Sequence, residues 1–164
     1  MRPFAALVIK DIKGYLDQPT GYIFLVILVT ALSVLFFRTA LLTTEASLRP
    51  MFDMLPWVLA IFIPATTMRL VAEEDRDGTL ELLFTHPIRD WLIVLAKFVS
   101  AQLFVSAGVI ATIVVALLLE TAGDLDRGAA TAQYLGSFGL TSAFVAIGIF
   151  TSGLTRNQIV AFMV

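Results

Sequence analysis

The sequence predicts an all-α protein, a polytopic transmembrane helix bundle with four full spans, the start of a fifth, and an N-terminal interfacial amphipathic helix. Hydrophobic residues make up 59% of the 164-residue chain and charged residues 15%, and the mean hydropathy is +0.91. This is more apolar surface than a globule of this length can bury in one core. Four apolar segments are each long enough to cross a hydrocarbon layer of ~30 Å. The chain therefore needs lipid as its solvent.

Residues 1–18 are predicted to form a connecting helix that lies in the membrane surface. Apolar residues share one face of this helix, and the charged residues, which include Lys10 and Lys13, lie largely elsewhere. The apolar set is Phe4, Ala5, Val8, Ile9, Ile12, Tyr15 and Leu16. A lead into the first span that makes no specific contact is the alternative. The mixed charges before the first apolar run do not fit a secretory signal peptide.

The first two spans are predicted at residues 20–42 and 54–72. Pro56 and Pro64 predict that the second span is kinked, and they are the candidate hinge. The hydroxyls of Thr66 and Thr67 are expected to satisfy backbone groups that a proline leaves unpaired.

The third span is predicted at residues 91–119, and its length suggests that its first turns project into water. Lys97 is expected to extend to the inner membrane surface. Gln102, Ser106 and Thr112 are the polar residues farther along the span. They are compatible with lining a pathway and also with bonding to neighbouring helices, and packing is the more common use.

The fourth span is predicted at residues 134–154. It holds two pairs of small residues with the four-residue spacing that lets helices approach closely in lipid, Gly139 with Ala143 and Gly148 with Ser152. Residues 159–164 begin a fifth apolar run that is too short to cross a bilayer. We expect the chain to be C-terminally truncated. The alternative is that this run dips into the interface.

Lys and Arg residues in the short loops predict the orientation. Eight of them lie on the inner side if the N-terminus is cytoplasmic, and three lie on the outer side. The inner set is Arg2, Lys10, Lys13, Arg69, Arg76, Arg89, Lys97 and Arg156, and the outer set is Arg38, Arg49 and Arg127. The predicted location is the cell (inner) membrane, multi-pass, with the N-terminus cytoplasmic.

A charged segment at residues 73–90 separates the second and third spans on the predicted cytoplasmic side. Gly78 permits a sharp turn, and Pro87 suits the first turn of a new helix. Leu80, Leu83 and Phe84 share one side of a short helix between them. Such a helix suits docking into a groove on a soluble partner. A solvated loop that only keeps out of the bilayer is the simpler alternative.

The sequence offers little catalytic chemistry. It has no cysteine and a single histidine, His86, so we expect no metal site and no cofactor. No GxxxxGK[ST] phosphate-binding loop occurs, so the chain is not expected to be an enzyme that hydrolyses ATP. Asp53 and Glu120 fall at the outer ends of their spans. No basic patch of the kind that binds nucleic acid is present.

Two blocks of residues resemble the membrane subunits of ABC-2 type ABC transporters, and within them the gliding-motility and copper-processing permeases. The first block is Met68, Arg69, Leu70, Ala72, Glu73, Glu74, Gly78, Thr79, Glu81, Leu82, Leu83, Thr85, Pro87, Ile88, Arg89, Leu95 and Lys97. The second is Ala146, Ile147, Gly148, Ser152, Leu154, Thr155, Asn157, Gln158 and Ile159.

The resemblance implies a six-span permease with a coupling helix that engages a separate ATP-binding subunit, and a second permease subunit in a homo- or heterodimer. Coupling would fall on Gly78 to His86, with Glu73, Glu74 and Arg76 before it and Arg89 after it. The implied contact residues are Glu73, Glu74, Arg76, Gly78, Thr79, Glu81, Leu82, Leu83, Pro87 and Arg89. Lys10 and Lys13 would lie on the connecting helix. A non-transporting anchoring or assembly protein, or an inactive truncated permease, is the alternative function.

Overall fold

The computed structural model describes residues 2–40, 47–76, 89–123 and 125–154, and side-chain positions are described for most of them. These residues lie almost entirely in helices, and no strand occurs within the described ranges. The helices are α1 (Arg2–Asp17), α2 (Pro19–Ala40), α3 (Arg49–Arg76), α5 (Asp90–Ala111), α6 (Ile113–Ala122) and α7 (Arg127–Leu154). The predicted all-α class is confirmed.

Four helical stretches are long and apolar enough to cross a membrane, as the sequence predicted. They are Pro19–Arg38, Arg49–Thr67, Trp91–Thr121 and Arg127–Gly153. Two of the helices begin earlier than the apolar segments alone suggested, since α3 starts at Arg49 and α7 at Arg127. The third stretch has 31 residues, which is roughly 46 Å of helix, so it is longer than the hydrocarbon layer.

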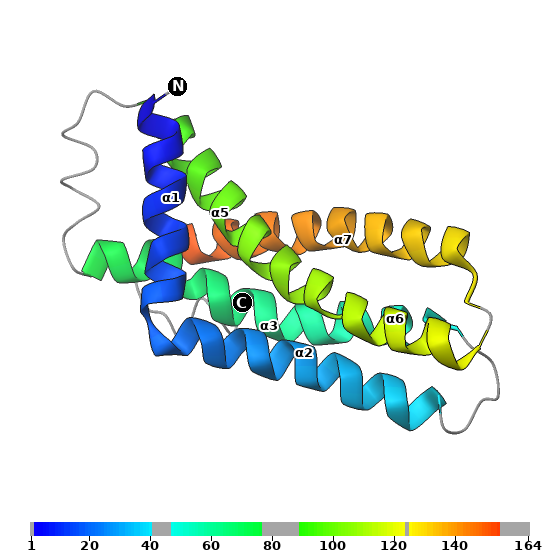
Figure 1. Cartoon of the computed structure of the whole chain (residues 1–164). Helices are drawn as coiled ribbons and strands as arrows, with labels where there is room; N and C mark the ends of the chain where they lie inside the picture. The colour runs from blue at the N-terminus through cyan, green and yellow to red at the C-terminus, as the bar shows by residue number, and fades with distance from the viewer. Residues whose placement is uncertain (1, 41–46, 77–88, 124, 155–164) are drawn as a thin grey trace.

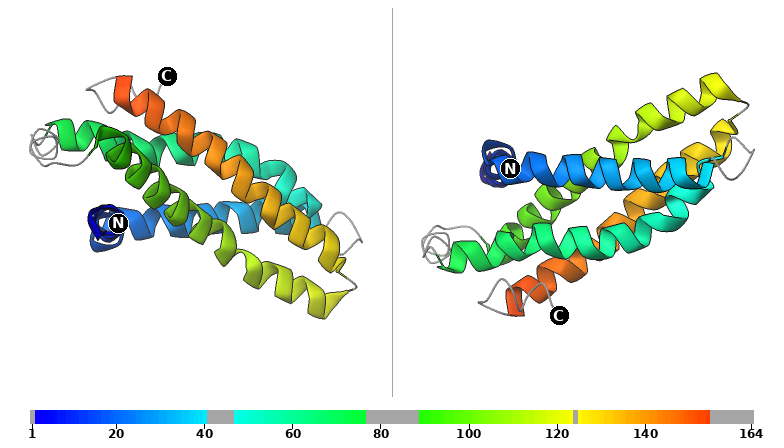
Figure 2. Two further views of the ribbon diagram at one scale, coloured as in Figure 1. Left: turned by 90° about the horizontal axis from the view of Figure 1, so that it is seen from above. Right: turned by 90° about the horizontal axis from the view of Figure 1, so that it is seen from below.

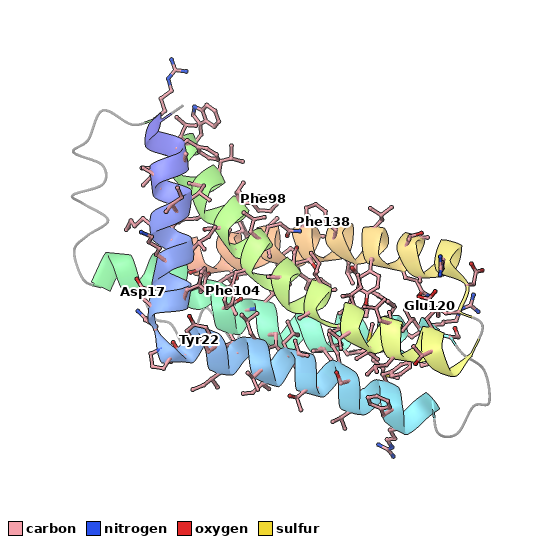
Figure 3. All side chains as sticks on the ribbon, viewed as in Figure 1. Asp17, Tyr22, Phe98, Phe104, Glu120 and Phe138 are labelled. Carbon is pink, nitrogen blue, oxygen red and sulfur yellow. The ribbon has the colours of Figure 1, made fainter. Side chains whose placement is uncertain are left out.

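The long helices lie side by side, and α1 lies across one end of the bundle (Figure 1). Both views in Figure 2 show α1 end-on while α2, α3 and α7 run lengthwise. The first helix packs against α5 and α2, and α3 packs against α7 and α2. The end of α3 and the start of α5 lie at the same end of the bundle as α1. Asp17 and Glu120 mark the two opposite ends (Figure 3).

The core of the bundle is apolar, and so is much of its outer surface. Leu32, Leu59, Ile63 and Val145 are fully buried. Large apolar side chains are exposed on the outside of α2, α3, α5, α6 and α7, among them Val26, Trp57, Val94, Leu117, Leu135 and Phe150. An outer surface of this kind is unusual for a protein in water, where extensive apolar patches are rare. It suits a bundle whose surroundings are lipid.

The chain turns sharply between α1 and α2, and Gly21 makes this turn possible. The Gly21 amide donates to the carbonyl of Gln18 at 3.1 Å. A Cβ added to Gly21 would overlap the carbonyl oxygen of Tyr15. Any other residue at position 21 would therefore force α1 away from its crosswise position.

The connection between α6 and α7 is fixed by local polar contacts. The Asp126 carboxylate accepts the backbone N–H groups of Gly128 at 2.9 Å and Ala129 at 3.1 Å, so it caps the first turn of α7. Arg127 forms an ion pair with Glu120 of α6, and its Nε donates to Glu120 Oε1 at 2.8 Å. Glu120 therefore serves the connection between α6 and α7, in agreement with its predicted place at the end of a span.

Candidate functional site

The predicted coupling residues fall into three groups in the structure. Glu73, Glu74 and Arg76 belong to the last turns of α3. Arg89 is exposed and extended, directly before α5. The remaining residues lie outside the described ranges, namely Gly78, Thr79, Glu81, Leu82, Leu83 and Pro87. The long helices α3 and α5 thus bracket the predicted coupling segment, at the end of the bundle where α1 lies.

The predicted connecting-helix lysines lie on α1, away from the face that packs on the bundle. Lys10 and Lys13 are exposed, and Lys10 Nζ lies 3.9 Å from the carboxylate of Asp11. The face of α1 turned to the bundle includes Val8, which is buried, and Tyr15. Ile9 and Leu16 remain exposed, although the sequence grouped them with the apolar face. Tertiary packing uses only part of the apolar arc of α1.

Tyr15 joins α1 to two of the spans. Its ring stacks on Phe104 of α5 with ring centroids 4.4 Å apart and planes 10° from parallel. Its hydroxyl donates to the carbonyl of Thr66 on α3 at 3.3 Å. Phe104 is labelled in Figure 3, where α1 crosses the bundle. A single side chain near the end of α1 therefore contacts both helices that lead to the predicted coupling segment.

The two candidate hinge prolines lie inside α3, which continues through both of them. The hydroxyls of Thr66 and Thr67 donate to the carbonyl of Ile63 at 2.9 and 2.8 Å. The acceptor that Pro64 leaves without its usual i−4 partner is the carbonyl of Ala60. The two hydroxyls bond to Ile63, about one turn after Ala60, because a Ser or Thr side chain reaches back only three or four residues along its helix. The sequence had led us to expect a bond to the group that the proline leaves unpaired.

The contact between α3 and α7 is close at Gly148. A Cβ added there would overlap the Thr67 hydroxyl. Ser152, one turn further along α7, is also buried. The predicted pair Gly148 and Ser152 is thus confirmed as a close-packing pair. By contrast, Gly139 and Ala143 are exposed, and nothing approaches within 4 Å of the Cβ position at Gly139.

Lys97 is buried, with only 4% of its surface exposed. The sequence does not indicate this burial, and the predicted extension of the side chain to the inner membrane surface stays a prediction. The burial arises from tertiary packing, since α1, α2, α3 and α7 all pack against α5.

Gln102 lies where α5 meets α7, and 4% of its surface is exposed. Its side-chain nitrogen donates to the carbonyl of Phe138 on α7 at 3.1 Å and to the Ser106 hydroxyl at 3.3 Å. Its side-chain oxygen is buried without a hydrogen-bond partner. An unpaired buried acceptor costs about 1–3 kcal/mol. The sequence marked Gln102 as polar, but only the structure shows that half of its amide is unpaired.

Thr112 interrupts the third span and separates α5 from α6. Its hydroxyl bonds to the carbonyl of Val109 at 2.6 Å and to the Tyr134 hydroxyl of α7 at 3.1 Å. The Tyr134 ring also meets Phe52 of α3 edge-on, with centroids 4.9 Å apart. The sequence predicted one span here, and Trp91–Thr121 is one stretch long and apolar enough to cross a membrane, with a break in the helix at Thr112 that the sequence did not indicate. A threonine inside an apolar run does not reveal that a tyrosine on another helix will bond to it.

The described residues offer no metal centre, because they contain no group of three or more His, Cys, Asp or Glu side chains that could hold an ion. The buried polar side chains are mostly hydroxyls, and most of them bond to the backbone of their own helix, as Ser100, Ser137 and Thr141 do.

Four apolar spans, a crosswise N-terminal helix and a polar residue between helices define a multi-pass membrane protein. Residues 33–164 match the model of the family described as ABC-2 family transporter protein. Since the match covers most of the chain, the protein belongs to the ABC-2 transporter family and is a membrane permease component of an ABC transporter. Members of this family generally partner with an ATP-binding subunit. The comparisons with curated proteins and with solved structures gave no match.

Proposed function

We propose that this chain is a permease subunit that couples ATP hydrolysis by a separate ATP-binding subunit to export of a substrate. The coupling contact is the segment from Gly78 to His86, with Glu73, Glu74 and Arg76 before it and Arg89 after it. One observation carries the proposal. In the sequence, this segment follows the last residue of α3 and precedes the first residue of α5. The last turn of α3 and the first turn of α5 lie where α1 crosses the bundle, so a force applied to the segment acts on two spans at once.

The force would pass to α1 through the contacts of Tyr15 with Thr66 and Phe104. Tyr15 bonds to α3 and stacks on α5, so α1 connects the two helices that flank the coupling segment. The prolines at 56 and 64 lie in α3, where the missing N–H groups weaken the backbone ladder. We propose that α3 bends at one of them when the ATP-binding subunits close.

The proposed setting is the inner membrane of a cell, with the N-terminus and the coupling segment on the cytoplasmic side. The count of Lys and Arg in the loops supports this orientation. The permease would act with a second permease subunit, identical or related, and its residues resemble the gliding-motility and copper-processing permeases.

Co-purification tests the coupling contact. The protein is purified from membranes that also contain its ATP-binding subunit, and the bound subunit is quantified. Replacing Glu81, Leu82 and Leu83 together by alanine should reduce the bound subunit by at least about tenfold, which corresponds to about 1.4 kcal/mol of binding free energy.

The matched control replaces Leu117 and Leu118 of α6 by alanine, because both are exposed at the opposite end of the bundle. This variant should bind as much ATP-binding subunit as the wild type does. Full retention of the subunit by the triple variant would contradict the proposed contact.

Single cysteines test the orientation, and the natural chain contains none that would interfere. Ser47→Cys should react with a membrane-impermeant maleimide in intact cells. Lys13→Cys should react only after the membrane is opened. The reverse pattern would place the N-terminus outside and would contradict a cytoplasmic coupling segment.

A further inference from the structure

The contact between α5 and α7 contains a buried polar atom that accepts no hydrogen bond in the folded bundle. Among the residues that the structure describes, the side-chain oxygen of Gln102 is the buried side-chain acceptor left without a partner. Gln102 itself is more than nine-tenths buried, and it sits between Phe138 of α7 and Ser106 of its own helix.

The bonds that Gln102 does make are not needed by its partners. The Phe138 carbonyl also accepts the hydroxyl of Ser142 at 2.9 Å. The Ser106 hydroxyl lies one turn beyond Gln102 and can bond to a backbone carbonyl of α5, as hydroxyls in helices commonly do. With the Ser106 hydroxyl turned to a carbonyl of α5, an apolar side chain at position 102 would leave neither partner unpaired, and it would remove the unpaired oxygen.

The other buried polar residues nearby differ from Gln102 in this respect. Ser100, Ser137 and Thr141 direct their hydroxyls to carbonyls of their own helices, at 2.9, 2.7 and 2.7 Å. These short side chains satisfy themselves locally, whatever the neighbouring helix does. The longer Gln102 side chain reaches across to α7 and brings an acceptor into a place where nothing donates to it.

We propose that Gln102 is a binding residue of the transport pathway, and that its side-chain oxygen accepts a hydrogen bond from a hydroxyl or amide N–H of the transported molecule when α5 moves away from α7. The inference rests on the proposed transport function and names the chemistry of its cargo. An amide oxygen accepts hydrogen bonds and carries no net charge, so it selects a donor and does not attract an anion.

The described structure represents the closed arrangement in this proposal. The unpaired oxygen makes that arrangement less favourable, so it lowers the free energy needed to separate the two helices. The bond from Gln102 to the Phe138 carbonyl breaks in that movement. A donor on the cargo then pairs with an oxygen that had no partner before.

Cysteine labelling in vesicles tests the movement, with the complete complex of permease and ATP-binding subunit. Ser106→Cys reports on the contact beside Gln102, and Ser100→Cys is the matched control because it is a buried serine on the same helix whose hydroxyl bonds to Lys97. We expect a bulky fluorescein maleimide to label S106C at least about tenfold faster during ATP hydrolysis than without nucleotide. S100C should not change.

The rates of cysteine labelling are measured in vesicles for which the rate of ATP hydrolysis is also known. Hydrolysis without faster labelling of S106C would overturn the inference and leave the proposed coupling function standing. Equal acceleration at S100C would indicate general loosening and would count against it.

The Gln102→Leu variant tests the role of the side chain itself. We expect its melting temperature in detergent to equal or exceed that of the wild type, a measurement that needs no ATP-binding subunit. In the Q102L background, labelling of S106C during hydrolysis should slow several-fold. A lower melting temperature would show that Gln102 is a structural cross-link, and unchanged labelling would show that it has no part in the movement. Either result would overturn the inference.

Discussion

The two contacts that α7 makes in the bundle differ in how they treat polar groups. Against α3, Gly148 allows Thr67 to approach closely, and the Thr67 hydroxyl bonds within α3. Against α5, Gln102 crosses to the Phe138 carbonyl and leaves its own oxygen unpaired. Close packing of small residues is the main source of helix association in lipid. The contact between α3 and α7 is closely packed and its threonine hydroxyl is paired, whereas the contact between α5 and α7 holds the unpaired oxygen of Gln102. In our proposal this oxygen favours separation of α5 from α7.

The contact between α5 and α7 is not uniform along its length. At Thr112 the threonine hydroxyl bonds to Tyr134, and both groups are satisfied. Phe52 of α3 packs on the same tyrosine. The part of this contact at Thr112 therefore joins three helices. A separation of α5 from α7 at Gln102 would turn about the junction at Thr112, where the helix is already interrupted.

The largest effect is expected from breaking the contact between α3 and α7. Gly148→Val places two methyl groups where Thr67 lies, so the helices must move apart, and overpacking of this kind costs about 1–3 kcal/mol. Reversible unfolding in mixed micelles gives the free energy of unfolding. Gly139→Val is the control, since nothing lies within 4 Å of that position. Equal losses in the two variants would contradict the assignment of the close contact to Gly148.

A smaller loss is expected when Tyr15 is replaced. Tyr15→Phe keeps the stack on Phe104 and removes the bond to Thr66, whereas Tyr15→Leu removes both. We expect the leucine variant to lose about 1–2 kcal/mol and the phenylalanine variant about half as much, because aromatic pairs and single hydrogen bonds contribute similar amounts. The same unfolding measurement tests this order. An identical loss in both would mean that only the hydroxyl matters.

The Thr112 junction should respond to removal of either hydroxyl. Thr112→Val and Tyr134→Phe each break the bond to α7 at the junction of α5 and α6, and bonds of this kind in membrane proteins contribute about 0.6 kcal/mol. A double-mutant cycle is the check, because the two losses should not add. Fully additive losses would show that the two hydroxyls act independently.

The smallest effect is expected from a hydroxyl that bonds only within its own helix. Thr141 is buried on α7 and donates to the Ser137 carbonyl at 2.7 Å. Thr141→Val should change the free energy of unfolding by less than about 0.5 kcal/mol, because the carbonyl keeps its backbone partner. A loss larger than that of Thr112→Val would contradict the distinction between local and cross-helix hydroxyls.

The candidate site could be predicted from sequence only in part. Gln102 and Thr112 were recognised as polar residues in an apolar span, because hydropathy shows them directly. Their partners Phe138 and Tyr134 lie on another helix, and no local pattern links the two segments. The small pair Gly148 and Ser152 had the same spacing as Gly139 and Ala143, yet the first pair is buried and the second exposed. Spacing identifies a helix face and does not tell which face meets a neighbour.

The sequence by itself determined the all-helical class, the four spans and the amphipathic α1, because hydropathy and helical periodicity are properties of short stretches of chain. Only the tertiary structure decided that α1 lies across the bundle, that Lys97 is buried and that Gln102 keeps an unpaired oxygen. Each of these depends on which residue of one helix meets which residue of another. That pairing is set by side-chain packing across the whole bundle, to which every span contributes at once.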